Sequence, residues 1–242
     1  MAERAALVTG ASGGIGAALA TALVAEGFDV TLSGRDPDRL ERLAAALSGR
    51  PGVSTRVHRA DLRDAEQVAG LAAAHAEGFG RLDVLVNCAG GGILAPLDEI
   101  EPRHVDTQLD LNVRAAILVF RACLPMLLAA AADAGRAHVV NVSSVAGKRG
   151  QPGLLVYSAA KFGLVGFSEA CNRDYGAEGI RSTVFCPGLV DTPLAAGLGV
   201  PPDKMIRPED LAEALRFLLR LSDACLVPEL SFLAADGRFG AE

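Results

Sequence analysis

Short runs of β-forming residues alternate with longer stretches of helical periodicity along the 242 residues of the chain. The expected strands are Arg4–Thr9, Phe28–Ser33, Val53–Arg59, Asp83–Asn87, Ala137–Val142, Ile180–Cys186 and Glu229–Leu233. Between them, helical periodicity covers residues 14–26, 36–48, 64–78, 103–133, 155–177 and 208–221. Such alternation is typical of βαβ units, in which helices cover both faces of a parallel sheet. The sequence therefore predicts an α/β fold, a doubly wound parallel seven-stranded sheet with helices on both faces.

The composition suits one domain with an aliphatic core. Half of the residues are hydrophobic, whereas aromatic residues make up only 5% and tryptophan is absent. No interior linker or charge block divides the chain, so we expect residues 1–242 to form a single domain. The net charge of −6 argues against a nucleic-acid partner, because proteins that bind nucleic acids usually carry a basic face.

Cysteine and histidine spacing argues against metal sites and disulfides. The five cysteines are scattered and include no CxxC pair, so neither a disulfide framework nor a zinc site is expected. The four histidines never stand four residues apart, and we expect no bound metal. No apolar run approaches the length of a membrane span or a signal-peptide core. A cytoplasmic protein with no membrane partner is the expectation.

The segment Thr9–Gly16 is rich in glycine and joins the first expected strand to an Ala-rich helix. Glycines in that context let the backbone turn tightly and approach a pyrophosphate, whose charge is met by the helix N-terminus. The pattern predicts a Rossmann-type dinucleotide site; a tight turn without a ligand is the alternative. The cofactor-binding residues assigned to this turn are Gly10, Ser12, Gly14, Ile15 and Gly16.

The end of the second strand indicates which nicotinamide cofactor the site takes. An NAD site usually carries a carboxylate there, and this strand ends without one. Arg35, which stands 19 residues after Gly16 (35 − 16), offers a guanidinium to a 2′-phosphate. We therefore expect NADP(H); the alternative is a solvated arginine at the start of a helix, partly neutralised by Asp36. After the third strand, Asp61 and Leu62 are assigned to the adenine, with a helix cap as the alternative for Asp61.

Three polar residues with matching spacing follow the fifth strand. Ser144 closes the segment Asn141–Ser144, Tyr157 comes 13 residues later, and Lys161 four residues after Tyr157. Residues four apart share a helix face, so we expect the ammonium of Lys161, together with an oxidised nicotinamide, to lower the pKa of the Tyr157 phenol. Tyr157 would then exchange a proton with an alcohol, while Ser144 polarises a carbonyl. Taken singly, each has an alternative role: Ser144 could be a helix cap, Tyr157 an aromatic residue at the rim of a site, and Lys161 a solvated lysine on a helix.

Over essentially its whole length the chain resembles the short-chain dehydrogenase/reductase family. TGASGGIG matches the family's TGxxxGxG motif and YSAAK matches its YxxxK motif. The family's NNAG motif appears as Asn87–Gly90, with Cys88 in place of the second asparagine, and Arg35 matches the NADP-preferring branch, which includes 3-oxoacyl-ACP reductases. The resemblance implies that Asn112, in a kinked helix, joins a proton relay to Lys161. It adds the following cofactor-binding residues: Asn87, Ala89, Gly90, Tyr157, Lys161, Pro187, Gly188, Val190 and Thr192.

The resemblance predicts an oxidoreductase that interconverts a carbonyl and an alcohol by hydride transfer. The leading hypothesis is an NADPH-dependent reductase of a ketone, an aldehyde or a 3-oxoacyl thioester. An NADP-dependent dehydrogenase of hydroxy acids or secondary alcohols is the alternative, and a non-catalytic dinucleotide sensor is a third. Residues 191–206, rich in Gly and Pro, are expected to form a substrate lid. The family often assembles as tetramers, so we expect a homo-oligomer, either a homotetramer or a homodimer.

Overall fold

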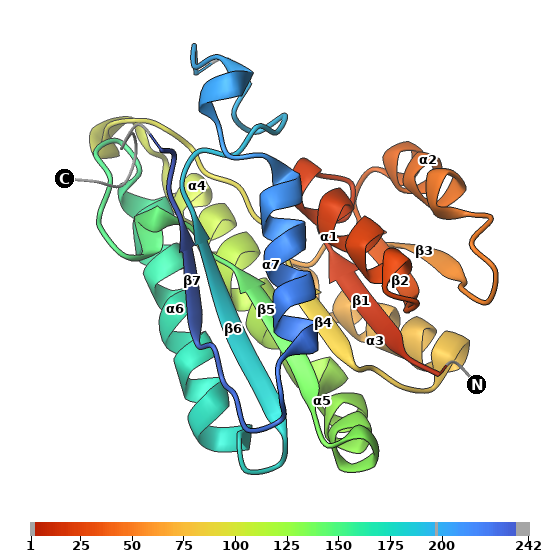
Figure 1. Cartoon of the computed structure of the whole chain (residues 1–242). Coiled ribbons are helices and arrows are strands. Elements are labelled where there is room, and N and C mark those ends of the chain that lie inside the picture. The colour runs from red at the N-terminus through yellow and green to blue at the C-terminus, as the bar shows by residue number, and fades with distance from the viewer. Residues whose placement is uncertain (1–2, 197, 236–242) are drawn as a thin grey trace.

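In the computed structural model, which describes residues 3–196 and 198–235, the strands form one parallel sheet. Its seven strands lie in the order β3-β2-β1-β4-β5-β6-β7 (Figure 1). The strand bounds are β1 Ala5–Thr9, β2 Asp29–Gly34, β3 Thr55–Arg59, β4 Val84–Asn87, β5 Ala137–Val142, β6 Ile180–Pro187 and β7 Glu229–Phe232. The order reverses between β1 and β4, which is where doubly wound sheets bind ligands at the carboxyl ends of their strands. The predicted fold class is confirmed.

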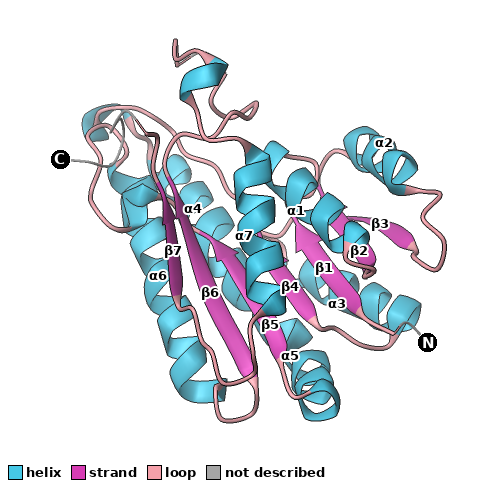
Figure 2. Ribbon diagram, viewed as in Figure 1, coloured by secondary structure: helices cyan, strands magenta, loops and turns pink. Residues whose placement is uncertain are grey.

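Helices cover both faces of this sheet (Figure 2). On one face lie α1 (Gly14–Ala25), α2 (Pro37–Leu47) and α7 (Pro208–Arg220), and on the other α3 (Ala65–Phe79), α5 (Ala115–Ala134) and α6 (Leu155–Tyr175). Strand β1 shows why both faces need cover: Ala6 and Val8 pack with the first group, Leu7 with the second, and all three are fully buried. Strands buried on both sides are accordingly almost continuously apolar, and in β1 only the last residue, Thr9, is polar.

The expected helix at 103–133 is bent within its length. It consists of α4 (Pro102–Leu109), one π turn, η2 (Asp110–Arg114), and α5. Helix α5 and its N-terminal extension are long and apolar enough to span a membrane, with a mean hydropathy of 2.1 in the most apolar window. That corrects the expectation that no run reaches such a length. In this fold the helix packs on the sheet, with Val119, Cys123 and Leu127 buried.

Other boundaries move by one or two residues. Strand β3 begins at Thr55 instead of Val53, and β7 ends at Phe232. Asp36 and Asp64 were expected to open helices, and they are the N-caps of α2 and α3, accepting from main-chain N–H groups of Arg39 and Glu66. An N-cap carboxylate satisfies N–H groups that lack partners in the first turn.

The segment 191–206, expected to be a lid, leaves the sheet after β6 and returns to α7, and residue 197 lies outside the described residues. Its only regular element in the described part is one short 3-10 turn, η4 (Pro202–Lys204). A β-bridge between Val190 and Ile206 joins its two ends, where the N–H of Asp191 donates to the Ile206 carbonyl at 2.9 Å. The segment is therefore a loop closed at its neck, and it projects beyond the sheet (Figure 1).

Candidate active site

The glycine turn lies between β1 and α1 at the carboxyl edge of the sheet. Gly10 has φ +66°, and a Cβ there would lie 2.8 Å from the main-chain nitrogen of Ala89. A Cβ on Gly16 would collide with the carbonyl of Gly10. Only glycine combines that left-handed conformation with so close an approach. The turn thus brings the backbone of the first strand against the segment that follows β4.

The N-terminus of α1 is left open by the same turn. Its N-cap, Gly13, has no side chain to bond the first-turn N–H groups of Gly14, Ile15 and Gly16. A Cβ on Gly14 would lie 2.8 Å from Cγ2 of Thr192. Unbonded N–H groups at a helix N-terminus favour an anion. The predicted phosphate residues and Thr192 therefore surround one space.

Arg35 lies at the end of β2 and is exposed. Asp36 does not neutralise it, since the Asp36 carboxylate caps α2 and pairs with Arg39 at 3.2 Å. Arg59, at the end of β3, donates from Nε to the Arg35 carbonyl at 3.2 Å, a neighbour that the sequence analysis did not single out. Ser12 is also close, with its Oγ 2.9 Å from where a Cβ on Gly34 would lie. Two guanidinium groups without a carboxylate partner in the described chain, together with a hydroxyl, form a site suited to phosphate.

Asp61 is already engaged by a neighbour. Its carboxylate accepts from Nε of Arg63 at 3.0 Å, and this bond lowers the Asp61 pKa to about 2. The alternative role of helix cap is wrong, because Asp64 caps α3. Leu62 is buried in the core next to it. An adenine amino group would have to share the Asp61 carboxylate with Arg63.

Ser144 and Tyr157 meet at the carboxyl end of β5. Ser144 follows that strand by two residues, and its Oγ accepts from the N–H of Ala146 at 3.1 Å. Tyr157 stands in the first turn of α6. Burial raises the pKa of Tyr157, and a hydrogen bond with the Ser144 side chain acts in the opposite direction. The phenol and the hydroxyl are thus neighbours, as their spacing predicted.

Lys161 lies on the same face of α6, but its role differs from the prediction. Nζ is buried, donates to the Val142 carbonyl at 2.9 Å, and lies 5.5 Å from the centroid of the Tyr157 ring. Desolvation of the phenol raises the Tyr157 pKa in this structure, which is opposite to the net direction that the sequence predicted. Burial also lowers the pKa of Lys161 itself to about 8.

Asn112 lies in the π turn η2, as the kinked helix implied. Its Nδ2 donates to the carbonyls of Gly91 and Gln108, each at 2.8 Å, and its Oδ1 accepts from the N–H of Gly91 at 3.1 Å. A Cβ on Gly90 would lie 2.8 Å from Oδ1 of Asn112 and 3.1 Å from Nζ of Lys161. The Asn112 amide, the Lys161 ammonium and the loop after β4 are therefore packed against each other at Gly90.

The segment after β4 shows what the cysteine changes. Asn87 donates to Oδ1 of Asn141 at 2.9 Å, so the first residue of the motif bonds across the sheet. The N–H of Cys88 donates to Oγ1 of Thr9 at 3.1 Å, and its thiol lies near Lys161. Burial raises the Cys88 pKa to about 12 in spite of that lysine. A packed thiol fits this environment, and its basic neighbour Lys161 is distant in sequence.

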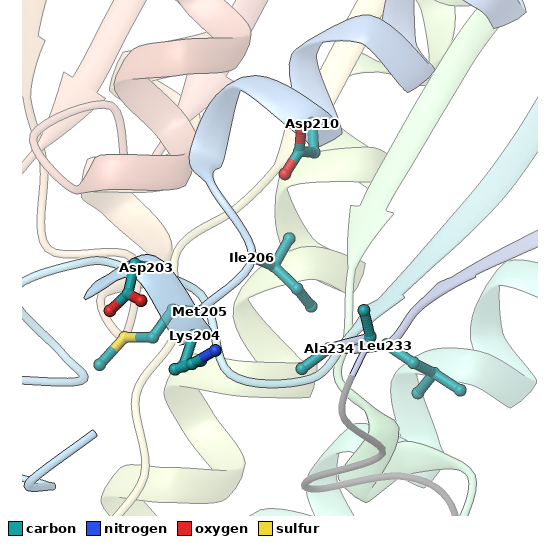
Figure 3. Close-up of a pocket in the computed structure, with 8 residues that line it drawn as sticks. Asp203, Lys204, Met205, Ile206, Asp210, Leu233 and Ala234 are labelled. Atoms are coloured by element: carbon teal, nitrogen blue, oxygen red, sulfur yellow. The ribbon is translucent and has the colours of Figure 1, made fainter. Parts of the chain in front are cut away.

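The residues after β6 begin the loop. Pro187 ends the strand, and the N–H of Gly188 donates to the Phe232 carbonyl at 2.8 Å, so this segment is tied to β7. Val190 is buried beside the loop neck. A pocket of about 350 Å³ lies between the loop, the start of α7 and the end of β7 (Figure 3). Met205, Ile206 and Leu233 line it, whereas Ser144, Tyr157 and Lys161 do not.

The fold, the open glycine turn and the Ser–Tyr–Lys cluster define a dinucleotide-binding oxidoreductase, and comparison with known proteins gives its family. Residues 4–200 match the model of the short chain dehydrogenase family. An uncharacterised oxidoreductase of Staphylococcus saprophyticus is 30% identical over 90% of this chain and 92% of its own. The chain belongs to the short-chain dehydrogenase family and is an oxidoreductase.

Two solved structures show the same likeness. An alcohol dehydrogenase from the archaeon Thermococcus sibiricus, complexed with 5-hydroxy-NADP, has a TM-score of 0.89 and 29% identity, covering 97% of this chain and 98% of its own. A 3-ketoacyl-(acyl-carrier-protein) reductase from Brucella melitensis, complexed with NADH, has a TM-score of 0.86 and 26% identity, covering 95% and 96%. The likeness thus extends over the whole sheet and its helices.

Proposed function

We propose that the protein is an NADPH-dependent reductase that converts a ketone, an aldehyde or a 3-oxoacyl thioester into the alcohol. The observation that carries this proposal is the position of Ser144 beside the Tyr157 phenol at the carboxyl end of β5, with Lys161 Nζ 5.5 Å from the centroid of the Tyr157 ring. A phenol with a raised pKa is protonated at neutral pH. It is therefore ready to give a proton, which is what carbonyl reduction requires.

The chain's own residues divide the work as follows. Ser144 donates to the carbonyl oxygen and polarises it, and Tyr157 gives that oxygen a proton as negative charge develops. Lys161, held by the Val142 carbonyl, places its positive charge near the ring of Tyr157 and passes a proton on toward the Tyr157 phenol. Asn112 holds the segment beside them and completes the relay. NADPH, when bound, supplies the hydride.

The cofactor assignment rests on the residues around the glycine turn. The α1 N-terminus and Ser12 would hold the pyrophosphate, and Arg35 the 2′-phosphate. Asp61 and Leu62 would border the adenine. Residues Asn87, Ala89, Gly90, Pro187, Gly188, Val190 and Thr192 would line the ribose and nicotinamide, as in the family motifs. The NADP analogue in the archaeal relative supports this preference, whereas the Brucella relative holds NADH.

The test of the cofactor assignment is Arg35→Asp. Losing the cation and adding a carboxylate should weaken NADPH binding about tenfold or more and strengthen NADH binding relatively, measured by fluorescence titration of each cofactor. Arg39→Asp, on the neighbouring helix, is the matched control. An unchanged preference for NADPH would remove the basis of the assignment.

The test of the reaction is a panel of ketones, aldehydes and 3-oxoacyl thioesters mixed with protein and NADPH, followed by the loss of NADPH absorbance. Turnover of a carbonyl at neutral pH supports the reductase. The dehydrogenase alternative needs the phenolate of Tyr157, so oxidation of an alcohol should become faster as pH rises. Binding of NADPH with no turnover of any carbonyl or alcohol would contradict the proposal.

We also propose that the chain forms homodimers or homotetramers in the cytoplasm. Ile117 on α5 and Phe162 on α6 are exposed apolar side chains, and a groove between these helices is lined by Phe120, Leu124 and Phe167. Exposed apolar patches often mark contact surfaces. All five cysteines are free, which suits a reducing compartment. Light scattering would measure the assembly, and Ile117→Glu should dissociate it.

We propose as well that residues 1–242 form a single domain and that residues 191–206 act as a substrate lid. The closed neck at Val190 and Ile206 supports a loop that moves as a unit over the substrate. Substituting Leu194, which is exposed, by serine should change KM for a carbonyl more than it changes the Kd of NADPH.

A further inference from the structure

Gln108, near the end of α4, uses both its side chain and its main chain beside the candidate active site. The residue is 3% exposed. Its Oε1 accepts from the N–H of Ile93 at 3.0 Å, and its carbonyl accepts from Nδ2 of Asn112 at 2.8 Å. A glutamine on the last turn before the π turn is therefore bonded both to the loop after β4 and to the Asn112 amide.

Two carboxamides thus hold one short loop, residues 91–93. Asn112 bonds both the N–H and the carbonyl of Gly91, and Gln108 bonds the N–H of Ile93. Gly92 lies between these anchor points, and a Cβ there would be 3.0 Å from Cδ2 of Tyr157. The 91–93 loop is therefore fixed at both ends and packs on the ring of Tyr157.

The Gln108 amide is costly for the fold. Its Nε2 is buried and has no hydrogen-bond partner among the described residues. The amide cannot be turned to avoid this, because the N–H of Ile93 needs the oxygen on its side. An unsatisfied buried donor destabilises a protein; methionine would fill a similar space without that donor but would leave the Ile93 N–H without its acceptor.

We propose that Gln108 is a positioning residue which, together with Asn112, holds the 91–93 loop against the ring of Tyr157 and so keeps the phenol aligned with Ser144. The inference rests on the proposed acid/base role of Tyr157. Gln108 does not touch the reacting atoms; it acts through the loop.

The experiment uses Gln108→Met, which keeps the length of the side chain and removes the acceptor for Ile93. We expect kcat for the best carbonyl of the panel to fall about tenfold or more, since small misplacements of a reacting group cost that much. The Kd of NADPH, measured by fluorescence, should stay within about twofold, because the glycine turn is untouched. Each kcat is expressed per cofactor-binding site, which removes the effect of unfolded protein.

The pH profile separates positioning from a purely structural role. A loosened loop admits water to the phenol, so the pH at which reduction declines should move to lower pH in Gln108→Met. Gln108→Glu keeps an oxygen for the Ile93 N–H and should recover kcat to within about threefold at mildly acidic pH, where a buried carboxyl is neutral. Asp106→Asn, an exposed position on the same helix, is the matched control and should match the wild type.

The outcomes distinguish this inference from the proposed function. If the wild-type protein reduces no carbonyl, the proposed function is wrong. If it does, and Gln108→Met has the wild-type kcat and pH profile, the positioning role is wrong. A loss of kcat without any change in the profile, or a folded Gln108→Glu that remains as slow as Gln108→Met, would equally overturn it.

Discussion

The two edges of the parallel sheet treat their polar groups in opposite ways. At the amino edge, Asp83 accepts from the N–H of Ala5 at 2.7 Å and from Arg81 at 2.6 Å, and Arg81 also pairs with Asp133. At the carboxyl edge, Lys161 is buried with a carbonyl as its hydrogen-bond partner, and no carboxylate neutralises it among the described residues. The amino edge pairs these charges within the chain, whereas at the carboxyl edge Asp61 is paired with Arg63 but Lys161 has no carboxylate partner among the described residues.

Buried side-chain nitrogen and oxygen atoms without hydrogen-bond partners lie mostly at the carboxyl edge of the sheet, with one exception. In the described part of the chain, Ser33, Asn87 and Gln108 each leave one such atom at or near the carboxyl edge, and His138 leaves one at the amino edge. Unsatisfied groups reduce stability. The comparison teaches that stability comes mainly from one edge and chemistry from the other, and substitutions can test each half separately.

The largest effect is expected for Tyr157→Phe. Removing the phenol oxygen removes the proposed proton donor, and kcat should fall about 1,000-fold. The ring and its packing remain, so the free energy of unfolding in urea should change by less than about 1 kcal/mol. Retained turnover would contradict the acid/base role of Tyr157. A large loss of stability would show that the carboxyl edge also contributes substantially to the free energy of unfolding.

Asp83→Ala should give the reverse result. It leaves the Ala5 N–H without its acceptor and leaves the Arg81 guanidinium with only the exposed Asp133, which together should cost about 3 kcal/mol of unfolding free energy. The turnover per folded molecule should match the wild type, because the side chain of Asp83 bonds Ala5 and Arg81, and neither belongs to the candidate site. Asp133→Ala, which removes an exposed partner of the same arginine, is the milder control. A selective loss of kcat would show that the two edges are coupled.

Lys161→Met tests the uncompensated charge at the carboxyl edge. Burial lowers the Lys161 pKa from 10.5 to about 8, so the wild-type protein bears the full cost below pH 8 and loses it as pH rises toward 10.5. The stability of Lys161→Met relative to the wild type should therefore decrease by about 2 kcal/mol between pH 7.5 and pH 9.5. Urea unfolding at both pH values measures it; a constant difference would mean that the ammonium is not desolvated.

His138→Leu tests the exception at the amino edge and has the smallest expected effect. Burial, followed by the charge of Arg136, lowers the His138 pKa from 6.5 to about 4. The unfolded chain binds a proton below pH 6.5 that the folded protein does not bind until about pH 4, so wild-type stability falls over that range. The leucine variant should lose about 1 kcal/mol less than the wild type between pH 6 and pH 5. Parallel pH profiles would contradict this.

The sheet was predictable because its strands are apolar and bounded by turns, and Ser144, Tyr157 and Lys161 because their spacing fits a strand end and one helix face. The bend at Asn112 came from a family resemblance, since helical periodicity runs unbroken through 103–133. The prediction that failed concerns the pKa of Tyr157, which depends on the surroundings of the phenol in the folded protein. Spacing places Lys161 beside Tyr157, but the burial of the phenol decides the direction of the Tyr157 pKa.

Contacts between distant segments were out of reach of the sequence. Gln108 is one polar residue on an otherwise ordinary helix, and its bond to Ile93 exists only because the loop after β4 folds back over α4. Arg59 and Arg35 become neighbours through the pairing of β2 with β3. Asp61 could not be recognised as the partner of Arg63 by type alone, because a carboxylate after a strand fits several roles.

The bridge between Val190 and Ile206 separates what lies inside the loop from the rest of the chain. Because the neck fixes where the chain leaves β6 and where it enters α7, residues can be added or removed between these points without shifting either element. The connection between β6 and α7 can thus be exchanged independently of the two elements that it joins. Under the proposed lid role, exchanging it for a loop of another length should alter what approaches Tyr157 while the sheet keeps its register.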